Sequence, residues 1–149
     1  MSTSNGQSKI KFPTKNRDGL SGASDVAVFK AVGDSYAKLN ETWAAAEADL
    51  LKFSVPTPVI HDIGCDEHET FHLGFVRHDG KWRICWGYLP HHSQPHDDWH
   101  WTPIAECPLA VRLSSVEHFG ELREKVREAA VQTVADVQQA IAKLNFELT

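Results

Sequence analysis

Apolar and polar residues alternate along residues 71–89 in a pattern that predicts a β-hairpin. Asp79 and Gly80 separate two runs rich in apolar and aromatic residues, and both tolerate the positive φ that a two-residue turn requires. A turn at this point pairs His78 with Lys81, and the pairing continues outward to Phe71 with Tyr88. A slip of one residue would mix the apolar and polar positions, so turn and alternation predict the same register.

This register divides the hairpin side chains between two faces of a sheet. The first face is apolar except for Arg77 near the turn, and it carries Phe71, Leu73, Phe75, Trp82, Ile84, Trp86 and Tyr88. The second face is mixed and includes His72, Gly74, Val76, Arg83, Cys85 and Gly87. We expect the first face to lie in the core, with Arg77 and Trp82 forming a cation–π pair at the hairpin end.

Apolar residues recur at alternating steps of three and four in two long segments, which predicts two amphipathic helices. The first begins after Ser24, whose side chain can cap the helix, and ends near Phe53 before a segment with two prolines. The second follows Pro108 and extends to about Leu144. Gly120 is its weak point, because glycine inside a helix costs about 1 kcal/mol relative to alanine. We therefore expect a kink or a junction of two helices at Gly120.

Two shorter segments complete a predicted four-stranded antiparallel meander. Residues 59–63 precede the hairpin, and the alternation in residues 99–104 predicts a fourth strand that Pro103 restricts to a short or edge position. We expect the two amphipathic helices to pack on the aromatic face of the sheet, which gives a two-layer α+β fold. Residues 24–149 would then form a single domain. Residues 1–23 are rich in Ser, Gly, Asn and Lys, and we expect them to be disordered.

The predicted helices are long enough to extend beyond the sheet. The first spans about 28 residues, or about 42 Å, whereas a typical strand is roughly 17–20 Å long. Apolar residues in the extensions, such as Phe53, Ile141 and Leu144, then require another partner. We therefore expect a homodimer formed through helices.

The composition is that of a protein of one ordinary domain: the chain has 149 residues, of which 42% are hydrophobic and 23% charged. A net charge of −5 disfavours nucleic acid as a partner. Three widely separated cysteines without a C-x-x-C pair fit a reducing compartment better than a disulfide framework. No secretory signal and no apolar run of about 20 residues is visible. We expect a cytoplasmic protein without a membrane partner.

Histidines gather in one polar, proline-bearing segment. All nine lie between His61 and His118, and the candidate metal ligands are His91, His92, His96 and His100, to which Asp97 and Asp98 could add carboxylates. Cys65 and His68, with His72 beyond them, form a second possible cluster. Zinc accepts such ligands. However, the chain has no H-E-x-x-H motif and no cysteine pair, so a solvated loop that is rich in histidine by chance is the simpler interpretation.

The mixed face of the hairpin is the predicted surface for a partner or ligand, with His72, Arg83 and Cys85 as its candidate residues. Arg83 would favour a Cys85 thiolate and His72 could act as a base, although an unpaired cysteine in a strand is usually a small buried apolar residue. Gly74 and Gly87 form a shallow trough on this face. Such glycines mark either close approach by a ligand or backbone, or local relief of twist.

The sequence contains a complete set of structural signals but no complete catalytic motif, such as a phosphate-binding glycine loop or a serine nucleophile elbow. The leading hypothesis is a non-enzymatic interaction or accessory module, homodimeric, with an unknown protein partner and no cofactor. The alternative is a metal-binding protein or metal-dependent hydrolase that uses zinc at the loop of residues 91–100. A third interpretation is a small-molecule pocket between helices and sheet that involves Trp86 or Tyr88.

Overall fold

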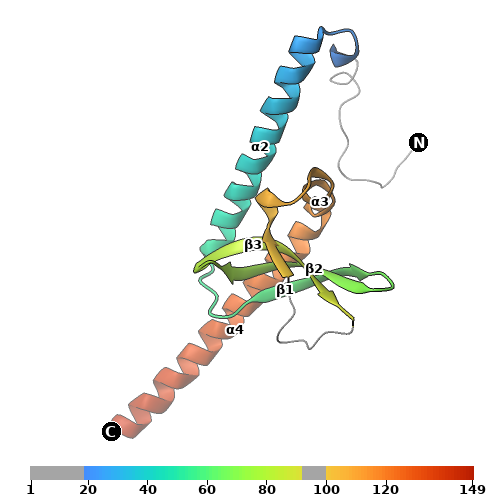
Figure 1. The fold of residues 1–149 in the computed structure, drawn as a ribbon. Coiled ribbons are helices and arrows are strands. Elements are labelled where there is room, and N and C mark those ends of the chain that lie inside the picture. Colours follow the sequence, from blue (N-terminus) through green and yellow to red (C-terminus); the bar gives the residue numbers. More distant parts are fainter. Residues whose placement is uncertain (1–18, 92–99) are drawn as a thin grey trace, which may run out of the picture. The chain divides into compact units, whose positions relative to one another are not determined.

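The structure is a computed structural model that describes residues 19–91 and 100–149. Its elements are α2 (Asp25–Leu51), β1 (Val59–Cys65), β2 (Glu69–His78), β3 (Lys81–Pro90), β4 (His100–Pro103), the 3-10 helix η2 (Ile104–Glu106), α3 (Leu109–Ser114) and α4 (Val116–Leu148) (Figure 1). An N-terminal helix, a four-stranded antiparallel sheet and a long C-terminal helix confirm the predicted α+β fold. Residues 19–21 form a helical turn, while the rest of the predicted disordered segment before them lies outside the described residues.

The chain divides within α2 into two compact units, residues 1–41 and 42–149. The described part of the first unit contains the beginning of α2. There the predicted cap is present, because the Ala27 N–H donates to Ser24 Oγ over 3.2 Å. The last turns of α2, the sheet, α3 and α4 belong to the second unit.

The sheet has the predicted meander order β1-β2-β3-β4, and the predicted hairpin register is confirmed from His78 with Lys81 to Phe71 with Tyr88. The turn residues Asp79 and Gly80 have φ of 51° and 80°, as a two-residue hairpin turn requires. The guanidinium carbon of Arg77 lies 5.9 Å from the Trp82 ring centroid, which confirms the cation–π pair.

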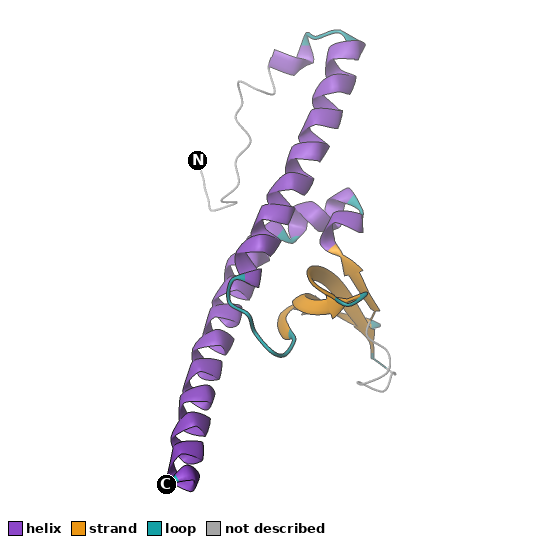
Figure 2. Ribbon diagram, turned by 90° about the vertical axis from the view of Figure 1, so that its left-hand side faces the viewer, coloured by secondary structure: helices purple, strands orange, loops and turns teal. Residues whose placement is uncertain are grey.

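The apolar face of the sheet forms the core of the second unit. Leu73, Phe75 and Ile84 on this face are at most 1% exposed, and Leu122 and Val126 of α4 are completely buried. α4 packs against β1 and β2, and Figure 2 shows it running along one side of the sheet. α4 therefore supplies one layer of the predicted two-layer arrangement.

The last turns of α2 pack against the start of α4. The Trp43 and Phe119 rings meet edge to face at 6.2 Å, and Arg123 Nε donates to Asp49 Oδ2 over 2.6 Å. Arg123 also lies over the Phe53 ring, 5.2 Å from its centroid. The prediction that Phe53 needs a partner from another chain is therefore wrong, because α4 of the same chain covers it.

The C-terminal helical segment is split, as expected, but not at the expected residue. The boundary between α3 and α4 lies at Ser115, which is 1% exposed, whereas α4 continues without interruption through Gly120. A single glycine removes no backbone hydrogen bond, and its cost of about 1 kcal/mol does not stop a helix of this length. The prediction of a kink or junction at Gly120 is therefore wrong.

The predicted extension of the C-terminal helix beyond the sheet is present. Figures 1 and 2 show the second half of α4 continuing past the strands. Its apolar residues Val137, Ile141 and Leu144 are 51%, 52% and 62% exposed. The apolar stripe that is buried at Leu122 and Val126 therefore continues onto an exposed surface.

Candidate functional site

The glycine trough on the mixed face is filled by a side chain of the same sheet. Trp101 pairs with Gly87 across β3 and β4, and its indole lies against both glycines. A Cβ on Gly87 would come within 2.4 Å of Trp101 Cε3, and one on Gly74 within 3.0 Å of Trp101 Cη2. The trough therefore serves close approach by Trp101 rather than an external ligand.

Two of the three predicted contact residues on this face have structural roles. Cys85 is completely buried, and burial, only partly offset by Arg83, raises the pKa of its thiol to about 12. The thiol therefore stays protonated and out of reach of a partner. Arg83 Nε donates to Glu47 of α2 over 3.1 Å. The same carboxylate accepts the Ile84 backbone N–H over 2.8 Å, at the point where β4 no longer pairs with β3.

His72, the third predicted contact residue, lies in a row of three polar side chains. Asp62 Oδ1 is 2.7 Å from His72 Nδ1, and Thr70 Oγ1 is 3.2 Å from His72 Nε2. β1 and β2 position them, because Asp62 pairs directly with His72 and Thr70 stands two residues away on the same face. The carboxylate–imidazole–hydroxyl order is the one that activates hydroxyl nucleophiles. The Asp62 carboxylate approaches His72 Nδ1 without the alignment of a hydrogen bond, so the row lacks the carboxylate–imidazole hydrogen bond on which that activation depends.

The histidine-rich loop lies mostly outside the described residues. His92 and His96 fall in that part, so a metal site of His91, His92, His96 and His100 stays a prediction. Of the two described members, His91 donates its backbone N–H to His68 O over 2.8 Å. The His100 ring stacks on Tyr88 with the centroids 4.6 Å apart.

Two other histidines meet on the face of β1 that lies opposite to the mixed face. His61 is 7% exposed, and its ring centroid lies 5.5 Å from that of His118 in α4. Glu121, one helical turn further along α4, places Oε1 3.5 Å from His61 Nε2. One ligand atom from each of these three residues lies within 4.8 Å of the other two. We call His61, His118 and Glu121 the β1–α4 cluster.

The β1–α4 cluster was not predicted from the sequence, although part of its signal is visible there. His118 and Glu121 stand three residues apart, a spacing that places both on one helix face. His61 comes from a strand far earlier in the chain. Only the packing of α4 on β1 brings it to the other two residues.

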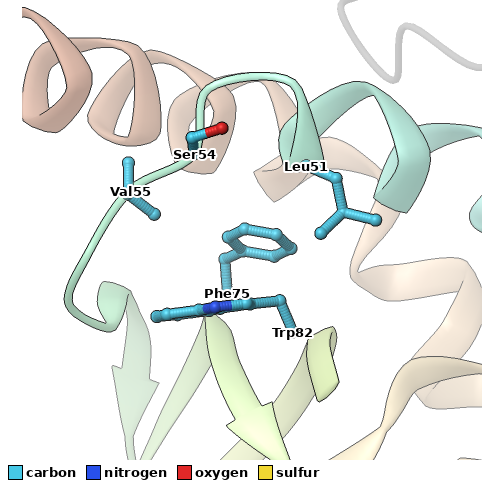
Figure 3. Close-up of a pocket in the computed structure, with 5 residues that line it drawn as sticks. All are labelled: Leu51, Ser54, Val55, Phe75 and Trp82. Atoms are coloured by element: carbon cyan, nitrogen blue, oxygen red, sulfur yellow. The ribbon is translucent and has the colours of Figure 1, made fainter.

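A small apolar cavity lies between the end of α2 and the hairpin. It measures about 300 Å³ and is lined by Leu51, Ser54, Val55, Phe75 and Trp82. Figure 3 shows the stacked rings of Phe75 and Trp82, whose centroids are 5.4 Å apart, below Leu51 and Val55. Neither Trp86 nor Tyr88 lines this cavity, so a pocket between helix and sheet is present but not at the two residues predicted from the sequence.

Among the described residues of the second unit, several exposed apolar side chains gather on α4. Val134, Val137, Ile141, Leu144 and Leu148 are all more than half exposed and follow each other at steps of three, four, three and four. We call these five residues the α4 seam. Such spacing is typical of helices that pack against another helix.

No protein-family model, curated protein or solved structure matches this chain. Within the described ranges, no helix combines the length and apolarity needed to cross a membrane.

Proposed function

We propose that the protein is a non-enzymatic interaction module that forms a homodimer through the α4 seam. The observation that carries the proposal is a single apolar stripe on α4 that is completely buried at Leu122 and Val126 but 52% and 62% exposed at Ile141 and Leu144. Exposed apolar residues with this spacing are stabilised when another helix covers them.

A second copy of the chain is the occupant that the flanking residues favour. The positions beside the seam are Thr133, Gln138, Ala140, Asn145 and Glu147. Four of these five residues are uncharged, so two copies can approach with little like-charge repulsion. In an antiparallel pair about a two-fold axis, Val137 of one copy lies beside Ile141 of the other, and Val134 beside Leu144. Both halves of such an interface are the same surface, as a two-fold symmetric dimer requires.

The expected dimer is weak. Covering a half-exposed Val, Ile or Leu contributes about 1 kcal/mol, so ten seam side chains contribute about 10 kcal/mol. Association itself costs about 4–15 kcal/mol. We therefore expect a dissociation constant in the micromolar range or weaker. The first unit carries a similar exposed stripe of Phe29, Val32 and Tyr36 on α2, which can add a second contact.

The test is the molar mass in solution, measured by analytical ultracentrifugation from low micromolar concentration upward. We expect a mass that rises with concentration from 16.7 kDa toward twice that value. Ile141→Glu should hold the protein at the monomer mass, because it places two like charges in the centre of the seam. Gln139→Glu adds the same charge on the opposite side of the helix and is the matched control.

Two outcomes would contradict the proposal. One is a wild-type protein that stays monomeric over the whole concentration range. The other is an Ile141→Glu variant that dimerises as well as Gln139→Glu. Both positions are exposed and lie in the second half of α4, so neither change should alter the melting temperature of the monomer.

A further inference from the structure

We propose that the β1–α4 cluster is a binding site for a divalent transition-metal ion, in which His61, His118 and Glu121 are the protein ligands and zinc is the preferred ion. This site is separate from the α4 seam and does not depend on dimerisation. It also differs from the histidine-rich loop of residues 91–100, with which it shares no residue.

The donor set is one that zinc uses. Two imidazole nitrogens and one carboxylate leave a fourth position of a tetrahedral ion open to water or a substrate. Donors about 2.1 Å from a tetrahedral ion lie about 3.4 Å apart. The His61 Nε2 to Glu121 Oε1 distance is already 3.5 Å. All three ligand atoms lie within 4.8 Å of one another. Only a small rotation of the exposed Glu121 side chain or of the His118 ring is needed to shorten the longer distances to about 3.4 Å.

The buried imidazoles provide an independent sign of a missing ligand. The His61 side chain is 9% exposed. Among the residues that the structure describes, no group forms a hydrogen bond with Nδ1 of His61 or Nδ1 of His118, although both atoms are buried. Buried polar atoms without a partner are rare in folded proteins and each calls for an explanation. A metal ion bound by Nδ1 of His118 provides one for that atom, whereas His61 would bind the ion through Nε2, the atom that faces Glu121.

The charges around the cluster are mixed. Lys125 is close enough to His61 to act on it electrostatically. Glu117 Oε1 lies 3.9 Å from His118 Nε2, from where a carboxylate can orient a ligating ring. Lys125 opposes a cation, so we expect moderate rather than tight affinity.

The experiment must separate this site from the histidine-rich loop. We would therefore measure Zn²⁺ binding by competition with a chromophoric chelator, and Co²⁺ binding by visible absorption. The protein used has no tag and carries His91→Asn, His92→Asn, His96→Asn and His100→Asn. This loop variant should still bind one equivalent of Zn²⁺, and Co²⁺ should produce the absorption bands of a four-coordinate ion.

Substitutions in the loop variant then test the ligands. His118→Gln should abolish the Co²⁺ bands, and Glu121→Gln should weaken Zn²⁺ affinity at least tenfold. Glu124→Gln is the matched control, because it removes the same charge from an exposed position on the same helix. Glu121 is 69% exposed, so its substitution leaves the fold intact. Zn²⁺ should raise the Tm of the loop variant but not that of Glu121→Gln.

Three results would overturn the proposal. The first is a loop variant that binds no Zn²⁺, which would assign all binding to the loop. The second is unchanged affinity in both His118→Gln and Glu121→Gln. The third is an equal loss in Glu121→Gln and Glu124→Gln, which would indicate only a general effect of negative charge. None of these results bears on the dimer proposal, which the molar mass tests separately.

Discussion

The indole of Trp101 lies against the backbone of Gly87 so closely that a β-carbon there would come within 2.4 Å of the ring. Gly87 stands in β3 and pairs with Trp101 in β4. The short edge strand β4 therefore contributes its side chain to the same face of the sheet as the glycine. An aromatic ring seated on a glycine in this way leaves no space for any other residue at that position.

Replacing this glycine should destabilise the protein. Gly87→Ala forces Trp101 or β4 to move, and we expect the free energy of unfolding to fall by about 2–3 kcal/mol. Gly120→Ala is the control, because nothing lies within 4 Å of a Cβ there. That helical position should gain about 1 kcal/mol. Urea unfolding measures both changes, and equal stability of the two variants would contradict the packing of Trp101 on β3.

The Glu47 carboxylate should be important for stability because it closes the free edge of β3. It is 19% exposed and accepts bonds from Arg83 and from the Ile84 backbone N–H. Glu47→Ala leaves that N–H and the guanidinium without this acceptor, and we expect a loss of about 2 kcal/mol. Asp34→Asn breaks an exposed ion pair with Lys30 and should leave the free energy of unfolding nearly unchanged. Comparable losses in the two variants would show that Glu47 has no special role.

The stability of the protein should decrease as the pH falls below the ordinary histidine pKa. Burial lowers the pKa of His61 from 6.5; Lys125 and His118 lower it further, whereas Glu121 and Asp62 raise it. Between this lowered pKa and 6.5, the unfolded chain binds more protons than the folded protein. The free energy of unfolding therefore decreases as the pH falls through that window.

Urea midpoints between about pH 7.5 and about pH 5, with a chelator present, measure this dependence. His61→Gln should flatten the slope, because glutamine does not titrate. His68→Gln replaces an exposed histidine and should leave the slope as in the wild type. If His61→Gln keeps the wild-type slope, another group is responsible for it.

The three cysteines should differ sharply in reactivity. Cys65 is exposed, whereas Cys85 and Cys107 are buried. Burial raises the pKa of Cys85 to about 12 and that of Cys107 to about 11. A thiol-specific disulfide reagent near neutral pH should therefore modify one thiol quickly in the folded protein and all three in urea. Cys65→Ser should remove the fast phase. Rapid modification of a second thiol would show that the core around Cys85 opens.

Local patterns in the sequence determined the sheet. The register of β2 and β3 follows from a two-residue turn and a period of two, both contained in one short segment. The cap at Ser24 is equally local. The split of the C-terminal helix was predicted at Gly120 but lies at Ser115, because a residue preference of about 1 kcal/mol is smaller than the free energy that packing can supply.

The tertiary structure alone decided what the sheet surfaces can do. The sequence placed Cys85 and the two glycines on one face of the sheet. Only the tertiary structure showed that the Trp101 side chain from β4 fills this face. His61 lies in β1 and His118 in α4, which are far apart in the sequence, and no local pattern links them. They meet because α4 buries its apolar stripe on β1 and β2. Contacts of this kind depend on the packing of whole elements, and short-range periodicity carries no information about them.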